Sequence, residues 1–101
     1  MVIKVIDHVG RCYSNQDGLI IKDLIQYNLK QDEKITVSFE GIDGVTSSFI
    51  NSALIELIEE YDFTVIKNNI TFTKSNKQIN NMIKDRFSFE LKRRKQTPLT
   101  V

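Results

Sequence analysis

Short apolar runs that alternate with segments of helical periodicity constrain the fold of this chain most strongly. The run 2–6 is rich in β-branched residues and too short for a helix, which predicts a strand covered on both faces and ending near 9–10. In 34–40, Ile35, Val37 and Phe39 alternate with polar residues, which predicts a second strand. Because helical segments separate the strands, we expect an α/β fold with a small, mainly parallel sheet and helices packed on it.

Three segments show apolar residues at spacings of three and four. They predict helices over 19–30, over 46–61 and from 76 to 95, the last one long and basic at its end. Between the second and third helices, the apolar residues of 63–65 and 70–72 flank Asn68-Asn69. Two asparagines tolerate the positive φ angles of a tight turn, so this stretch predicts a small hairpin.

The length of 101 residues is typical of one domain, which we place at 1–95, with a disordered tail at 96–101. Cys12 is the only cysteine, which rules out an intramolecular disulfide and a thiolate metal cluster and favours a reducing, cytoplasmic setting. We see no signal peptide, and no stretch approaches the roughly 18 apolar residues of a membrane span.

The net charge of +1 conceals an uneven distribution. Residues 1–73 carry 6 basic and 11 acidic side chains, whereas 74–101 carry 8 basic and 2 acidic ones. Four successive cations, Lys92, Arg93, Arg94 and Lys95, exceed what a helix C-terminus needs. With Lys84 and Arg86 they form a candidate contact for an anionic partner, and a nucleic-acid-associated accessory protein is our alternative function. The absence of interleaved aromatic residues and the acidic body favour a solvated helix end.

Signatures of catalysis are sparse. His8 is the only histidine, and its closeness in sequence to Cys12 makes a thiol–imidazole pair conceivable. A hydrolase built on Cys12, His8 or Ser48 is a third hypothesis, but a strand-end histidine and an incidental thiol explain the same residues. The sequence contains no glycine-rich phosphate motif and no metal-ligand spacing. We therefore expect no enzymatic activity, no cofactor and no metal.

The segment 39–51 is the most informative one. A strand end is followed by a loop with Gly41 and Gly44, and then by Thr46-Ser47-Ser48 where the helix begins. Thr46 or Ser47 can simply cap the helix. The free N–H groups of a helix start also favour an anion. Two further interpretations therefore stay open, namely a phosphate carried by Ser47 or Ser48, and a bound nucleotide or other small ligand.

This segment resembles the STAS family, the domains shared by sulfate transporters and anti-sigma factor antagonists, and more closely the small STAS-like domains of unassigned function. The likeness covers 34–61 well and rests on Phe39, Gly41, Val45 and Ser47-Ser48. In the antagonists, Asp-Ser-Ser-Gly opens the helix and a partner kinase phosphorylates the second serine, which corresponds to Ser48. Here Thr46 replaces the aspartate and Phe49 the glycine.

The resemblance implies a non-enzymatic regulatory module that binds a protein partner of the ATPase or kinase type. It makes Ser48 the candidate phosphoacceptor, with Ser47 as the second candidate, and a phosphate there would end the complex. The partner is expected on the exposed edge of the helix, where Ile55 lies off the apolar stripe. The predicted contact residues are Thr46, Phe49, Asn51, Ser52, Ile55 and Glu59.

Overall fold

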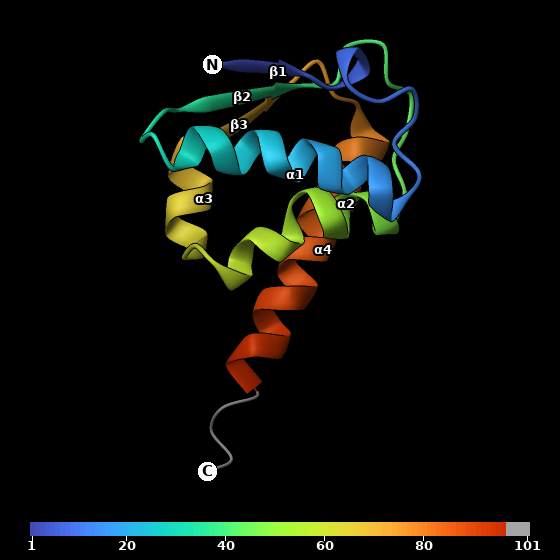
Figure 1. Ribbon diagram of the computed structural model, residues 1–101. Coiled ribbons are helices and arrows are strands. Elements are labelled where there is room, and N and C mark those ends of the chain that lie inside the picture. Colours follow the sequence, from blue (N-terminus) through green and yellow to red (C-terminus); the bar gives the residue numbers. More distant parts are fainter. Residues whose placement is uncertain (97–101) are drawn as a thin grey trace.

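The structure is a computed structural model that describes the backbone of residues 1–96 (Figure 1). Residues 97–101 of the predicted tail lie outside the described residues. The elements are β1 (Val2–Lys4), the 3₁₀ turn η1 (Val5–Asp7), α1 (Asn15–Leu29), β2 (Ile35–Ser38), α2 (Ser47–Ala53), the 3₁₀ helix η2 (Ile55–Glu59), α3 (Phe63–Asn69), β3 (Ile70–Thr73) and α4 (Lys77–Gln96). The predicted α/β class, the small parallel sheet and the long C-terminal helix are confirmed.

The three strands lie in the order β1-β2-β3, and both pairs are parallel. Ile3 is in register with Val37, and Val37 with Phe72. Since both crossovers step in the same direction across the sheet, their common handedness places the intervening helices on one side. Figure 1 shows this two-layer arrangement, with the sheet above and the helices below it.

Within residues 1–96, one face of the sheet is largely open. The alternation along the strands sends Ile3, Val37 and Phe72 toward the helices, whereas Val2 on the opposite face is 64% exposed. Parallel strands are usually covered on both faces, but the prediction that the first strand is covered on both faces is wrong. That strand is also shorter than predicted, because the chain turns into η1 after Lys4. Hydroxyl side chains of Thr36 and Thr71 make the open face compatible with water.

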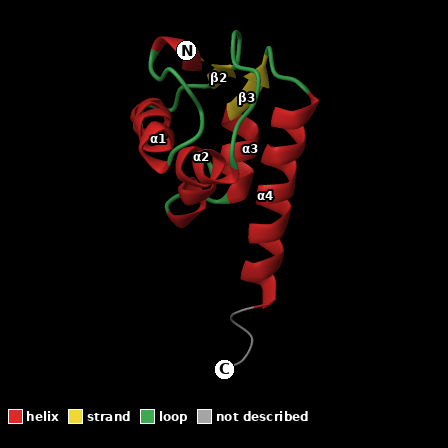
Figure 2. Ribbon diagram, turned by 90° about the vertical axis from the view of Figure 1, so that its right-hand side faces the viewer, coloured by secondary structure: helices red, strands yellow, loops and turns green. Residues whose placement is uncertain are grey.

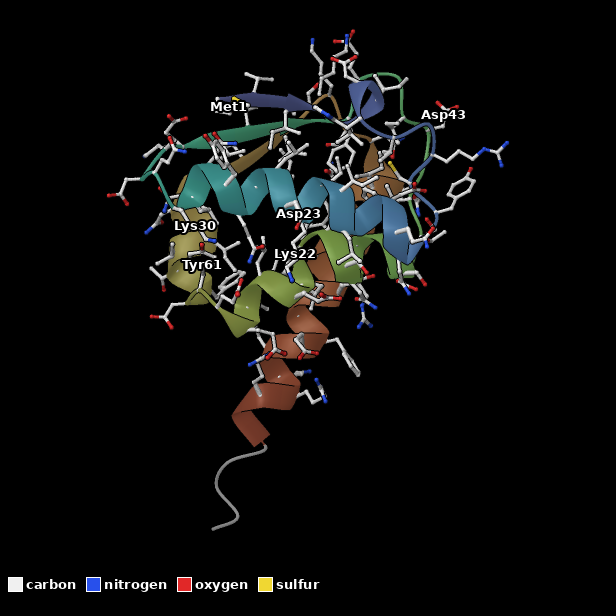
Figure 3. The ribbon with its side chains drawn as sticks, viewed as in Figure 1. Met1, Lys22, Asp23, Lys30, Asp43 and Tyr61 are labelled. Carbon is white, nitrogen blue, oxygen red and sulfur yellow. The ribbon has the colours of Figure 1, made fainter. Side chains whose placement is uncertain are left out.

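The helix α1 confirms the first helical prediction and begins four residues earlier than the periodic segment. Ser14 caps it, since its Oγ accepts the Asp17 N–H at 3.1 Å. Ile21, Ile25 and Leu29 are buried against the sheet and the other helices. At the edge of this buried side, Lys22 Nζ lies 3.3 Å from Glu56 Oε1, so an ion pair joins α1 to η2, and Figure 3 labels Lys22.

The single helix predicted over 46–61 is instead divided in two. The α-helix ends at Ala53, Leu54 has φ −125° and ψ −48°, and the chain continues as η2. The tighter winding of a 3₁₀ helix turns Ile55 inward together with Leu57, and Ile55 is 7% exposed. The prediction that Ile55 lies off the core is therefore wrong.

The predicted hairpin at 63–72 is also wrong, because 63–69 forms α3 and β3 runs parallel to β2. Phe63 packs on Phe87 of α4, with ring centroids 5.3 Å apart, and Ile66 is buried. Asn69 does not form a hairpin turn, since its Nδ2 donates to the Val65 carbonyl at 2.8 Å and closes the end of the helix. The packing of the short helix α3 on α4 therefore outweighed the weak strand pattern of residues 63–69.

The long helix α4 is confirmed, with Ile79, Ile83 and Phe87 buried along one side. Asn76 caps its start, since Asn76 Oδ1 accepts the Ile79 N–H at 3.0 Å. Figure 2 shows the second half of α4 extending past the other helices, away from the sheet. No helix in the described part of the chain has both the length and the apolar character that crossing a membrane requires.

Candidate functional site: the start of helix α2

The loop between β2 and α2 is held at both of its ends. Gly41 has a φ of +81°, which favours glycine, and a Cβ there would also lie 2.8 Å from Ile6 Cδ1. At the other end, Val45 N–H donates to Gln78 Oε1 and Gln78 Nε2 donates to Val45 O, both at 3.0 Å. The Asp43 carbonyl accepts Asn76 Nδ2 at 2.8 Å, and Figure 3 shows Asp43 at the outer edge of this loop. The start of α4 therefore fixes the approach to α2.

Thr46 is the residue that caps α2. Its Oγ1 accepts the Phe49 N–H at 3.2 Å and donates to the Tyr13 carbonyl at 2.8 Å. Its backbone N–H donates to the Cys12 carbonyl at 3.1 Å. Of the two caps that the sequence allowed, Thr46 is the one used, and it also ties α2 to the segment before α1.

Ser47 and Ser48 are the first two residues of α2, and both side chains are exposed. Because Thr46 supplies the cap, neither hydroxyl is needed to hold the helix start. Within residues 1–96 neither hydroxyl has a hydrogen-bond partner. The site thus presents two adjacent, accessible serines on a rigidly held helix end.

The predicted partner contacts divide by exposure. Phe49, Ser52 and Ile55 are 1%, 4% and 7% exposed, so they hold α2 in the core, and the expectation that they lie on an open edge is wrong. Ser52 Oγ donates to Asn15 Oδ1 at 3.2 Å, which explains why a polar residue is buried there. Thr46 and Asn51 are partly exposed. Glu59 is exposed and belongs to η2.

One protein family matches most of the chain. The sequence model of the family described as the STAS-like domain of unknown function (DUF4325) matches residues 17–80. The chain belongs to this family. No curated protein and no solved structure matches the chain significantly. The matched range of this STAS-like domain begins within α1, contains β2, the loop, α2, η2, α3 and β3, and ends at the start of α4.

The two residues of the conceivable thiol–imidazole pair differ in environment. His8 is exposed at the end of η1, while Cys12 is buried and 1% exposed. Burial, and to a smaller extent the nearby Asp17 carboxylate, raises the pKa of the Cys12 thiol to about 11. A thiol with this pKa stays protonated near neutral pH, and only the thiolate is a strong nucleophile. Among residues 1–96 no cluster of histidine, cysteine and carboxylate side chains could hold a metal ion.

Much of the basic end of α4 is paired within the STAS-like domain. Arg93 Nη2 lies 2.7 Å from Glu90 Oε1, and Arg94 Nη2 lies 3.0 Å from Glu59 Oε1. Glu90 is 6% exposed, and its hydrogen bond from Arg93 is the main cause that holds its pKa below the usual value. Lys92 is exposed, and the side chain of Lys95 lies outside the described residues.

Glu90 has a pairing role that was not predicted from the sequence. Its spacing of three and four residues from Arg93 and Arg94 is the signal that could have shown it. Arg94 adds a long-range contact that no spacing shows, because it joins α4 to η2 through Glu59. The Arg94–Glu59 pair connects α4 to η2, while the pairs with Glu90 lie within α4, and together they offset part of the positive charge of this helix end.

Proposed function

We propose that this STAS-like domain is a non-enzymatic regulatory module that binds a protein partner of the ATPase or kinase type around the start of α2. Ser48 is the proposed phosphoacceptor and Ser47 the second candidate. The observation that carries the proposal is the pair of exposed serine hydroxyls that the fold itself does not use. Membership of a STAS-like family supports a regulatory role for such a site.

The surroundings of Ser48 favour a change of binding rather than a change of fold on phosphorylation. A phosphate adds about −1.5 to −2 charges. Those charges would meet exposed surface at the positive end of α2, whereas the core contacts of Phe49 point inward. Asn51, one turn after Ser48, accepts a hydrogen bond from Arg86 Nε at 2.8 Å, which brings a cation to this side of α2. The domain would tolerate the modification, while an acidic partner surface would be repelled.

The two departures from the antagonist pattern are compatible with this role. Thr46 caps the helix as an aspartate in that position can, because both side chains offer an oxygen to the N–H groups of the first turn. Phe49 adds an apolar anchor under α2 and leaves the two serines on the outside. Recognition by a kinase would therefore rest on the exposed Thr46-Ser47-Ser48 surface and on Asn51.

Two competing functions receive less support. The raised pKa of the Cys12 thiol and the exposed, separate position of His8 weigh against a thiol hydrolase. Binding of nucleic acid by the end of α4 would compete with the pairs that Arg93 and Arg94 form with Glu90 and Glu59. We therefore place the functional surface at α2.

Affinity capture from the native cell with wild type, Ser48→Ala and Ser48→Asp tests the proposal. We expect wild type and Ser48→Ala to retain a partner that Ser48→Asp releases, and intact-mass analysis of the recovered wild type to show a gain of one phosphate. Thr64→Asp is the matched control, because it adds the same charge at an exposed hydroxyl of α3. Equal retention by all variants without a phosphate would contradict the switch, and recovery of nucleic acid would favour the basic helix end.

A further inference from the structure

A largely apolar groove of about 360 Å³ lies between α3 and α4 beside β3. Ile70 and Phe72 of β3 form its floor, and Phe63 of α3 and Phe87 of α4 contribute to its walls. Protein interiors rarely leave gaps larger than a water molecule, and sites that hold ligands begin near this volume. The groove is therefore large enough to receive several side chains.

Two cations border this apolar surface. Lys67 of α3 and Lys84 of α4 line the groove and are exposed. Within the described residues neither lysine has an ion pair or a hydrogen bond, in contrast to Lys22 and Arg94. None of the residues that line the groove is acidic. The charge pattern complements an apolar occupant that carries carboxylates at its sides.

The edge of the sheet beside the groove has unused main-chain groups. The Thr73 carbonyl accepts the Phe39 N–H at 3.0 Å, so Thr73 points its main-chain groups toward β2. By the alternation of a strand, the N–H and carbonyl of Phe72 point away from β2. The sheet of the described residues ends at β3, and there the Phe72 groups have no partner. An edge strand of this kind can pair with another chain.

We propose that this groove binds an extended segment of a partner protein, in which apolar side chains beside aspartate or glutamate fill the space between α3 and α4 while the main chain pairs with Phe72. An extended chain is the occupant that fits all three observations. A bound helix keeps its main-chain bonds to itself, and a fatty acid has no N–H for the Phe72 carbonyl. The site lies on α3, β3 and α4, apart from Ser47 and Ser48, and adds a second protein contact to the proposed function.

Fluorescence anisotropy at low salt with a labelled peptide of alternating leucine and glutamate tests this site. We expect saturable binding that weakens with added salt and is lost when lysine replaces glutamate in the peptide. The double variant Lys67→Glu/Lys84→Glu should weaken binding about tenfold. Lys92→Glu is the matched control, because this exposed lysine of α4 does not line the groove. Circular dichroism of each variant checks that it is folded.

Two further measurements separate the proposal from its alternatives. Hydrogen exchange followed by NMR should show that the Phe72 amide becomes protected when the peptide binds, and Ser48→Asp should leave the peptide affinity unchanged. Leu91→Gln, a change at a half-buried residue of the groove, should also weaken binding. Absence of peptide binding, binding without protection of Phe72, or binding of dodecanoate alone would overturn the proposal, and none of these results bears on Ser48.

Discussion

Gly18 lies where α1 crosses α2, and replacing it with alanine tests the packing that positions the Ser48 end of α2. A Cβ at Gly18 would lie 2.6 Å from the Phe49 carbonyl oxygen, 2.7 Å from Ser52 Cβ and 3.0 Å from Ala53 N. Two of these atoms belong to the backbone of α2, so no flexible side chain can turn aside. The helices would have to move apart.

The size of the effect follows from two opposing contributions. Inserting a methyl group into a closely packed site costs about 1–3 kcal/mol, and contact with two backbone atoms of α2 places Gly18→Ala near the upper limit. Alanine favours the helix over glycine by about 1 kcal/mol. We expect a net loss of about 2 kcal/mol in the free energy of unfolding, which lowers the Tm of a domain of this size by roughly 10 °C.

Urea unfolding followed by circular dichroism measures this loss. Gly10→Ala is the matched control, since a Cβ there meets nothing within 4 Å, and we expect a change of less than about 0.5 kcal/mol. A Gly18→Ala protein as stable as the wild type would refute the close approach of α1 and α2.

Three further predictions concern single side chains. Thr46→Ala should lose about 1 kcal/mol in urea unfolding, because it removes the cap of α2 and the bond to the Tyr13 carbonyl, while Thr46→Ser should keep most of it. Glu90 has a pKa below its ordinary value of 4.5, so its pairs stabilise the folded state above that pH and the contribution is lost as the pH falls through the lowered pKa. Chemical unfolding across this acid range should show a steeper decline for wild type than for Glu90→Gln. Buried Cys12, with a pKa of about 11, should react slowly with a thiol reagent in the native state and rapidly in urea, and a fast native reaction would contradict its burial.

Prediction from sequence succeeded where the signal is local. In α1 and α4 the apolar spacing predicted the buried residues Ile21, Ile25, Ile79 and Ile83, because a helix repeats its side chains at a fixed angle whatever it packs against. Capping at the start of α2 could likewise be predicted, since a hydroxyl side chain before the first turn meets free N–H groups. The alternation of Ile35 and Val37 indicated β2 for the same kind of reason.

Prediction failed where short segments depend on their neighbours. Residues 63–69 are compatible with a strand or a helix, and packing of Phe63 on Phe87 together with the parallel course of β3 selected the helix. At Ile55 the change from α-helix to 3₁₀ helix altered which residues face inward, and spacing alone does not show where such a change occurs.

The sequence by itself determined the α/β class, the main helices and the serine-bearing start of α2, because each depends on periodicity or capping within a few residues. Only the tertiary structure decided that Thr46 alone caps α2 and leaves the hydroxyls of Ser47 and Ser48 unused. It also decided the open sheet face, the pairing of Arg94 with Glu59 and the groove beside Phe72. These features join residues far apart in the chain, and their contacts form only when the helices pack on the sheet.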